Sequence, residues 1–259
     1  MNYQIKGNGK ETLVLLHGFM ENLSIWSDME PHLSENFSLL KIDLPGHGQS
    51  DIIAEVQTME LIAEEVKKVL DHQNLQKVHL LGHSMGGYIS LGFAEKYPEY
   101  LKSLTLFFSS YLADDEEKKE QRIKSYRIIK DAFPHYVRAG IPNLFNPNER
   151  DILEGKIETA LEVALSTNNM GALASVKGMV ERTDKKHVLE NLDVKILVLA
   201  GKHDNAVKTE AMIRHLPDRT NIKSYILDCG HNGHWEKPSI CAEIINTELL
   251  HNLPKHLVL

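Results

Sequence analysis

Short apolar runs alternate along the chain with longer segments in which apolar residues recur at helical spacing. Each of the six runs is followed closely by Gly, Pro or Ser, residues that favour turns at the ends of strands. Such runs are typical of strands that are buried on both faces of a parallel sheet. The six predicted strands are residues 12–16, 37–43, 77–81, 102–108, 195–200 and 223–227.

Helical segments lie between or after these runs. Segment 58–73 places its apolar residues on one face and begins at Thr58, which is a suitable N-cap residue. Segment 84–97 stops at Pro98, and segment 236–252 follows the last apolar run. Strands that alternate with helices in this way predict an α/β fold with a doubly wound, mostly parallel sheet.

The alternation stops between residues 111 and 192, where helical patterns occur without a strand run. A helical insertion between two strands predicts a cap over the carboxyl edge of the sheet, the edge at which α/β proteins place their sites. We therefore expect a single core, formed by residues 1–110 and 193–259, with a cap at 111–192. The predicted cap helices are residues 114–133, 152–165 and 173–180.

The first cap helix carries two contrasting patterns. Its charged run at residues 114–120 predicts a face in contact with solvent. The residues expected near one packed face of this helix are Ile123, Tyr126, Ile129 and Phe133.

Composition limits the class of protein. The chain has 259 residues, of which 42% are hydrophobic and 25% charged, and these are ordinary values for a globular protein. Its net charge of −7 disfavours a nucleic-acid partner. The longest apolar run, residues 196–200, is far shorter than the roughly 18 residues of a membrane span. Because the first residues lack the apolar segment of a signal peptide, we expect a cytoplasmic protein.

The segment Gly82-His83-Ser84-Met85-Gly86-Gly87 carries the clearest chemical pattern. It follows a predicted strand directly and opens a predicted helix. A serine between two glycines in this context predicts a sharp strand-to-helix turn, because the backbone segments approach too closely for a Cβ atom. Such a turn projects the serine hydroxyl outward at a helix N-terminus, which favours developing negative charge.

A serine nucleophile needs a base, and the base needs a group that orients it. Asp204 and His231 each follow a predicted strand, so both are expected at the same sheet edge as Ser84. The order Ser, Asp, His matches that of hydrolases built on such turns. Rivals are Asp228, which the pattern assigns to a strand, and Asp43, which lies in a turn.

The chain resembles the α/β-hydrolase superfamily in its single-domain form with a helical cap. The resemblance covers nearly the whole chain outside the cap and rests on residues 15–19, 43–50, 82–87, 200–204 and 230–238, which read LLHGF, DLPGHGQS, GHSMGG, AGKHD and GHNGHWEKP.

This resemblance implies that Ser84 is the nucleophile, His231 the general base and acid, and Asp204 the residue that orients His231. It also implies an oxyanion hole formed by the backbone N–H groups of Phe19 and Met85. His231 is preferred over His234 because the family pattern has Glu five residues after the catalytic histidine and Pro two residues later.

The resemblance implies a serine hydrolase that acts on a small ester or related acyl substrate without a cofactor or metal. His231, His234 and Glu236 have a spacing that metal ligands use, but the glycine between the two histidines and the lack of a clear third-ligand cluster disfavour such a site. The candidates for lining the substrate pocket are Tyr126, Phe133, Tyr136, Phe145, Met170 and His234.

Other functions of the same fold remain as alternatives. Serine at the elbow disfavours haloalkane dehalogenases and the epoxide hydrolases of this fold, because both of these families use aspartate at that position. Tyr88 disfavours the lyase of menaquinone synthesis, whose family tends to have arginine directly after the elbow glycines. Hydrolases of C–C bonds share the same three residues and stay as an alternative. A ligand receptor with little turnover is the alternative from another class of function.

Overall fold

The computed structural model describes residues 1–250 and contains a seven-stranded sheet in the order β1-β3-β2-β4-β5-β6-β7. Strands β2 to β7 are parallel, and β1 pairs antiparallel with β3 at one edge. The predicted doubly wound, mostly parallel sheet is confirmed. The strands are β1 (Tyr3–Lys6), β2 (Glu11–Leu16), β3 (Phe37–Ile42), β4 (Val78–His83), β5 (Leu101–Phe107), β6 (Lys195–Gly201) and β7 (Ile222–Leu227).

The six predicted strands match β2 to β7, whereas β1 has no counterpart in the sequence prediction. Three of the four residues of β1 are exposed, and its neighbour is β3, where Tyr3 lies opposite Ile42. An edge strand of this kind needs no apolar run, because its main chain pairs on one side and its side chains meet solvent.

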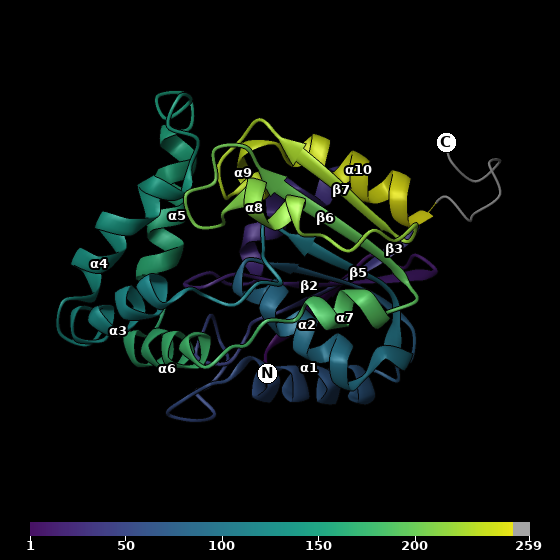
Figure 1. Ribbon diagram of the computed structural model, residues 1–259, viewed down its shortest axis with the longest axis horizontal. Coiled ribbons are helices and arrows are strands. Elements are labelled where there is room, and N and C mark those ends of the chain that lie inside the picture. Colours follow the sequence, from purple (N-terminus) through teal and green to yellow (C-terminus); the bar gives the residue numbers. More distant parts are fainter. Residues whose placement is uncertain (251–259) are drawn as a thin grey trace.

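Helices cover both faces of the sheet, with α1, α2 and α7 on one face and α10 on the other (Figure 1). The hydroxyl of Thr58 accepts a hydrogen bond from the Leu61 amide, so the predicted N-cap of α1 is confirmed. No helix within residues 1–250 is long and apolar enough to cross a membrane. The core helices are α1 (Met59–His72), α2 (Met85–Lys96), α7 (Lys186–Asn191), α8 (Thr209–Arg214), α9 (Gly233–Glu236) and α10 (Pro238–Leu250).

The predicted helix 236–252 differs from the structure at its start. A short helix, α9, ends at Glu236, and α10 begins at Pro238. Proline disfavours helical backbone at the residue before it, which accounts for the break at Lys237. Residues 251 and 252 of the predicted helix lie outside the described residues.

The insertion between β5 and β6 is helical, and four of its helices gather beside one end of the sheet (Figure 1). Helix α7 lies apart from them and contacts α2 of the core. We therefore propose a cap that ends before α7, which is shorter than the predicted range 111–192. The four helices are α3 (Glu116–Asp131), α4 (Phe133–Gly140), α5 (Glu154–Leu165) and α6 (Asn169–Val180).

The prediction of one packed face and one solvent-exposed face for the first cap helix is only partly confirmed. Ile129 is buried, as predicted, but the side chain of Ile123 is 51% exposed. Within the charged run, Asp114 is buried and Lys118 half-buried, so this run is not a purely solvent-exposed face. Helical spacing places residues on one face but does not identify the partner that each face meets.

Helix α2 begins directly after β4 and lies very close to the backbone of its neighbours. A Cβ atom on Gly82 would overlap the carbonyl group of Gly86, and one on Gly86 would overlap the carbonyl oxygen of Leu16. The close approach predicted for these glycines is therefore confirmed. By contrast, a Cβ on Gly92, later in α2, would meet its nearest neighbours at 3.6 Å, an ordinary contact distance.

These two glycines of α2 give a matched test of the close approach. We expect Gly86→Ala to lower the free energy of unfolding by about 3 kcal/mol, because the methyl group forces α2 away from β2. Gly92→Ala is the control, and we expect it to leave stability unchanged or raise it by about 0.5–1 kcal/mol through helix propensity. Urea denaturation followed by circular dichroism measures both, and an equal effect of the two substitutions would contradict the expectation.

Candidate active site

Ser84 occupies a strained turn between β4 and α2. Its backbone has φ 50° and ψ −112°, a conformation that residues with a side chain adopt rarely. Such a conformation costs on the order of 1–3 kcal/mol and persists only where the surroundings impose it. The amide of Ser84 donates to the carbonyl of Phe107 at the end of β5, with N···O 3.0 Å, which ties the turn to the sheet.

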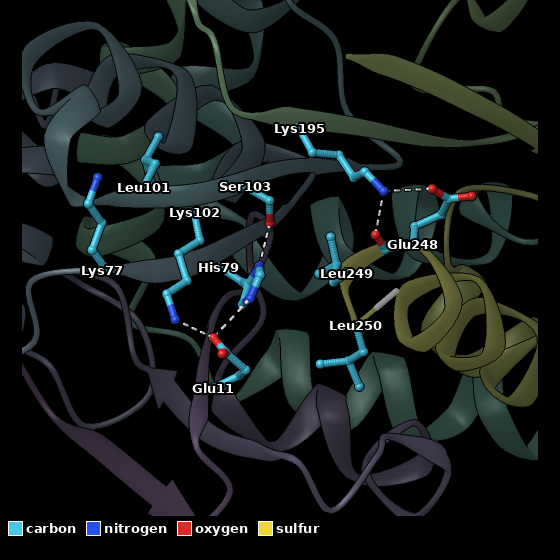
Figure 2. Close-up of a pocket in the computed structure, with 10 residues that line it drawn as sticks. All are labelled: Glu11, Lys77, His79, Leu101, Lys102, Ser103, Lys195, Glu248, Leu249 and Leu250. Carbon is cyan, nitrogen blue, oxygen red and sulfur yellow. Dashed lines mark hydrogen bonds and ion pairs between the residues drawn. The ribbon is translucent and has the colours of Figure 1, made fainter. Parts of the chain in front are cut away.

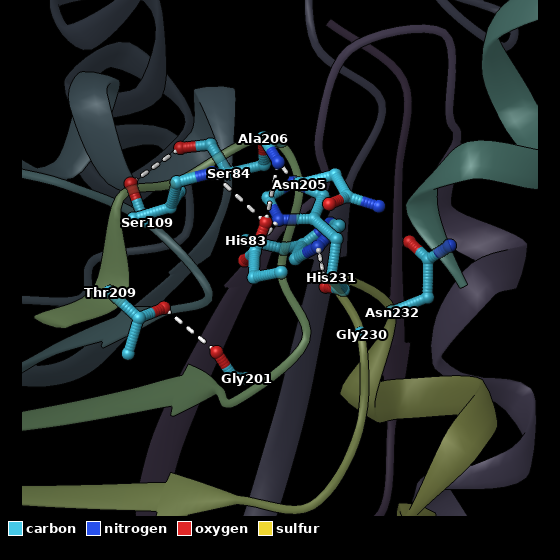
Figure 3. A network of polar contacts seen from close by, with 12 residues as sticks. His83, Ser84, Ser109, Gly201, Asn205, Ala206, Thr209, Gly230, His231 and Asn232 are labelled. Carbon is cyan, nitrogen blue, oxygen red and sulfur yellow. Dashed lines mark hydrogen bonds and ion pairs between the residues drawn. The ribbon is translucent and has the colours of Figure 1, made fainter. Parts of the chain in front are cut away.

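Ser84, His231 and Asp204 form a continuous chain of hydrogen bonds. Nε2 of His231 lies 2.8 Å from Oγ of Ser84, and Nδ1 lies 2.7 Å from Oδ2 of Asp204. Figure 3 shows Ser84 and His231 converging above the ends of the strands. The loop after β6 supplies Asp204 and the loop after β7 supplies His231, so the structure brings together the three residues that the sequence singled out.

Asp204 is fixed from both sides of its carboxylate. Its Oδ1 atom accepts the amides of Ala206 (2.7 Å) and Val207 (2.9 Å), while Oδ2 faces His231. Burial opposes a positive charge on His231, but the carboxylate of Asp204 and its hydrogen bond outweigh burial and raise the pKa of His231. The pair therefore stabilises an imidazolium at the position of the base.

The two aspartates that rival Asp204, Asp228 and Asp43, have other hydrogen-bond partners. Asp228 follows the end of β7 rather than belonging to it, and its exposed side chain is bonded to His203. Both carboxylate oxygens of Asp43 accept hydrogen bonds: Oδ2 from the side chain of Asn2 and the amide of Gln49, and Oδ1 from the amide of Leu23.

The cavity at Ser84 has a volume of 110 Å³ and lies between the core and the cap. Phe19, from the loop after β2, lines it, and the amide of Met85 is the first of helix α2, where no helical acceptor exists four residues earlier. The residues around the cavity are Phe19, Met20, Glu21, His83, Ser84, Tyr88, Lys118, Arg122, Leu144, Met179, Ala206 and His231.

None of the six predicted pocket residues is among those that line this cavity. Met170 is 45% exposed on α6, and Phe145 is fully buried, stacked on Trp235 with ring centroids 6.1 Å apart. Phe133 and Tyr136 belong to α4 and Tyr126 to α3, where they pack against the core cluster. His234 is fully buried. The cap residues that do line the cavity, Lys118, Arg122, Leu144 and Met179, were missed because helical spacing alone does not orient a cap helix toward the sheet.

Beneath the cavity, Glu21 and His83 form a buried pair that the sequence did not reveal. Oε2 of Glu21 accepts the amide of Gly18 (2.5 Å) and faces Nδ1 of His83 (2.8 Å), while Nε2 of His83 lies 3.1 Å from the carbonyl oxygen of His231. Both partners of His83 are hydrogen-bond acceptors, so the ring bridges the carboxylate of Glu21 and the main chain of His231. Burial alone would raise the pKa of Glu21, but the charge and hydrogen bond of His83 lower it to about 2.

The same region holds the cluster with the geometry of metal ligands. Ligand atoms of Glu21, His83 and His234 lie within 4.8 Å of one another, and all three residues are buried. However, Oε2 of Glu21 is already occupied by the Gly18 amide and by His83. Burial and the charge of His83 hold the pKa of His234 well below its usual range. We interpret Glu21 and His83 as a hydrogen-bonded support of the site, beside which both ring nitrogens of His234 have no hydrogen-bond partner among the described residues.

A larger cavity, of 450 Å³, lies at the opposite edge of the sheet (Figure 2). Its lining includes Glu11, Lys102 and Lys195, at or near the amino ends of β2, β5 and β6. Sites in α/β proteins form at the carboxyl ends of strands, where Ser84 lies. The smaller cavity is therefore the candidate active site.

The buried pair leads to a prediction about stability. Glu21→Gln keeps an oxygen for the Gly18 amide but removes the negative charge, so we expect the free energy of unfolding to fall by about 2–3 kcal/mol at pH 7.5. The pKa of Glu21 is lowered from 4.5 to about 2, so this stabilisation is present above pH 4.5 and is lost as the pH falls through 2. The difference in the free energy of unfolding between the wild type and Glu21→Gln should therefore become smaller as the pH falls below 4.5.

Urea denaturation at a series of pH values measures this difference. Glu35→Gln, at an exposed position, is the control and should change stability by less than about 0.5 kcal/mol. A Glu21→Gln variant as stable as the control variant at pH 7.5 would refute the buried ion pair.

Comparisons with known proteins show the family to which the fold belongs. A model of the alpha/beta hydrolase fold matches residues 11–238. An esterase from Thermogutta terrifontis, solved with malate bound, is 30% identical with a TM-score of 0.89, and the match covers 96% of this chain and 93% of that one.

Two curated relatives come from Pseudomonas putida. A 2-hydroxy-6-oxononadienedioate/2-hydroxy-6-oxononatrienedioate hydrolase is 26% identical over 268 residues, which cover 97% of this chain and 92% of that protein. The dihydrolipoyllysine-residue acetyltransferase component of an acetoin cleaving system is 30% identical over 258 residues, which cover 98% of this chain but 66% of that longer protein. With its fold and its family match in agreement, the chain belongs to the enzyme family of the alpha/beta hydrolase fold.

Proposed function

We propose that the protein is a serine hydrolase that cleaves a small ester or related acyl substrate. The observation that carries this proposal is the chain of hydrogen bonds from Ser84 through His231 to Asp204, with Ser84 at the wall of a cavity. A cavity of 110 Å³ favours a short acyl group. The esterase from Thermogutta terrifontis, at 30% identity, supports ester chemistry.

The proposed reaction begins when Oγ of Ser84 attacks the substrate carbonyl while Nε2 of His231 takes the hydroxyl proton. The amides of Met85 and Phe19 donate hydrogen bonds to the oxyanion of the tetrahedral intermediate, each worth roughly 3–4 kcal/mol. His231 then gives its proton to the leaving alkoxide, which departs as an alcohol and leaves an acyl-enzyme on Ser84.

Water completes the cycle. His231 removes a proton from a water molecule, which attacks the acyl-enzyme carbonyl, and the second tetrahedral intermediate uses the same two amides. As it collapses, the proton returns from His231 to Ser84, and the acid is released. Asp204 keeps the Nδ1 proton of His231 in place and stabilises the imidazolium in both halves of the reaction.

A second candidate is hydrolysis of a C–C bond by the same three residues. The relative from Pseudomonas putida at 26% identity, whose name states hydrolysis of 2-hydroxy-6-oxononadienedioate, favours it. Parallel assays of short-chain esters and of a vinylogous 1,5-diketo acid, in which a carbon rather than an oxygen leaves, separate the two reactions.

A fluorophosphonate probe tests the proposed nucleophile directly. We expect the probe to label the wild type and to leave Ser84→Ala unlabelled, because the probe reacts with an activated serine. Ser90→Ala, in the same helix but bonded to the Gly86 carbonyl, is the matched control and should be labelled as the wild type is. Labelling that persists in Ser84→Ala would overturn the proposal, and labelling without turnover on any ester or diketone would favour a ligand receptor.

The substitution Asp204→Asn tests the proposed role of the Asp204 carboxylate, which is to orient His231 and raise its pKa. The carboxylate raises the pKa of His231, and the base must be neutral, so activity is lost as the pH falls through that raised pKa. We expect the variant to lose about 10³- to 10⁴-fold in kcat. The acid limb of its kcat/KM profile should move to lower pH, because the imidazolium loses its partner. An unshifted acid limb in an active variant would show that Asp204 does not set the pKa of the base.

A further inference from the structure

Helix α3 of the cap directs two cationic side chains toward the cavity at Ser84. Lys118 and Arg122 are four residues apart, so they lie on the same face of the helix, and both line the cavity. Lys118 also lines an adjoining pocket of 260 Å³, which Tyr88 and Ala206 share with the first cavity. Lys118 thus lies where the Ser84 cavity opens into the larger pocket.

The two aspartates that precede Lys118 are engaged by other cations. Asp114 is shared by two arginines: its Oδ2 accepts from Nε of Arg122 at 2.6 Å, and its Oδ1 accepts from Nη2 of Arg182 at 2.5 Å. Asp115 accepts the Lys118 amide as the N-cap of α3, and its other oxygen pairs with Lys208 at 2.7 Å. Both oxygens of Asp114 are therefore engaged by arginines.

The other acidic groups nearby are also engaged or face solvent. Asp204 is bonded to His231, Glu21 is bonded to His83, and Glu117 in the adjoining pocket is exposed. Within residues 1–250, the ammonium group of Lys118 has neither a hydrogen-bond acceptor within reach nor an ion-pair partner. Burial lowers the pKa of Lys118, the charge of Arg122 lowers it further, and the aspartates around it do not offset these effects.

An ammonium group that is partly withdrawn from water and lacks a protein partner interacts more favourably with an opposite charge than a fully solvated one does. Structural lysines elsewhere in this chain have such partners: Lys195 is bonded to Glu248, and Lys185 is bonded to Glu95 and Glu60. The open position next to Ser84 is therefore suited to an anionic group of the substrate.

We propose that Lys118, with Arg122 behind it, binds a carboxylate at the far end of the acyl chain that Ser84 attacks. The natural substrate would then be an acyl compound with a second, ionised carboxyl group, such as a monoester of a short dicarboxylic acid. This inference rests on the proposed hydrolase function and adds the substrate class. A neutral acyl chain would leave the ammonium unpaired, so the same residue selects against it.

Two substrates that differ only in charge test the proposal. Monomethyl glutarate and dimethyl glutarate share one acyl chain, and release of acid in a pH-stat measures the initial hydrolysis of both. We expect the wild type to prefer the monoester by about tenfold or more in kcat/KM. Lys118→Met should lose about 10- to 100-fold on the monoester, mainly through KM, and less than about 2-fold on the diester.

Two further variants separate charge from packing. Lys118→Arg keeps a cation and should retain most of the preference for the monoester. Lys124→Met removes a lysine of the same helix that is 75% exposed and pairs with Glu120, and it should leave both rates unchanged. Equal losses on both esters in Lys118→Met, or equal rates of the two esters in the wild type, would overturn the proposed carboxylate site.

A binding experiment keeps this inference distinct from the hydrolase proposal. Calorimetric titration with succinate, glutarate and adipate, with glutaramide as the neutral control, needs no turnover. We expect at least one dicarboxylate to bind the wild type about tenfold more tightly than glutaramide and to lose that advantage in Lys118→Met. If neither ester is hydrolysed but this difference is found, the esterase proposal fails and the carboxylate site stands. If no dicarboxylate binds better than glutaramide, the site itself is refuted.

Discussion

The strained turn at Ser84 is the constraint on which the rest of the site depends. A residue at φ 50° gains nothing locally from that conformation, so the packing of α2 against β2 and β4 must hold it. That packing requires glycine at positions 82 and 86, where the backbones of two elements almost touch. The turn aims Oγ at His231 and leaves the first amide of α2 unpaired in the helix, so one close approach positions both the proposed nucleophile and a proposed oxyanion donor.

The buried pair of Glu21 and His83 extends this constraint to the other loops. Through one carboxylate oxygen and one imidazole ring, it joins the amide of Gly18 to the carbonyl of His231. Since buried charges are costly unless every donor and acceptor is used, the pair is favourable only when both loops are in place. The loop that carries His231 and the loop that carries Gly18 are therefore coupled, although they are far apart in the sequence.

The sequence predicts the core far better than the cap, because the apolar patterns of the two parts have different physical causes. Strands β2 to β7 are apolar because both faces of the sheet are covered, and Ser84, Asp204 and His231 follow strand ends whose location is set by parallel topology. Strand β1 is held by main-chain pairing to β3, which leaves no apolar pattern. The lining of the cavity depends on how α3 is rotated against the sheet, and Ile123 and Lys118 show that periodicity leaves this rotation open.

The division between core and cap also separates the groups proposed to catalyse the reaction from those proposed to select the substrate. The groups proposed to stabilise the transition state are backbone amides and three side chains in core loops, fixed by close packing and buried charge. The groups that meet the remainder of the substrate lie on the cap, where Lys118 and Arg122 belong to a helix that is largely polar along its length. The side chain of Arg122 is bonded to Asp114 and Met179 rather than to the turn at Ser84, so Arg122 and Ser84 meet across the cavity. The charge carried by the cap can therefore set the substrate class while the reaction itself stays the same.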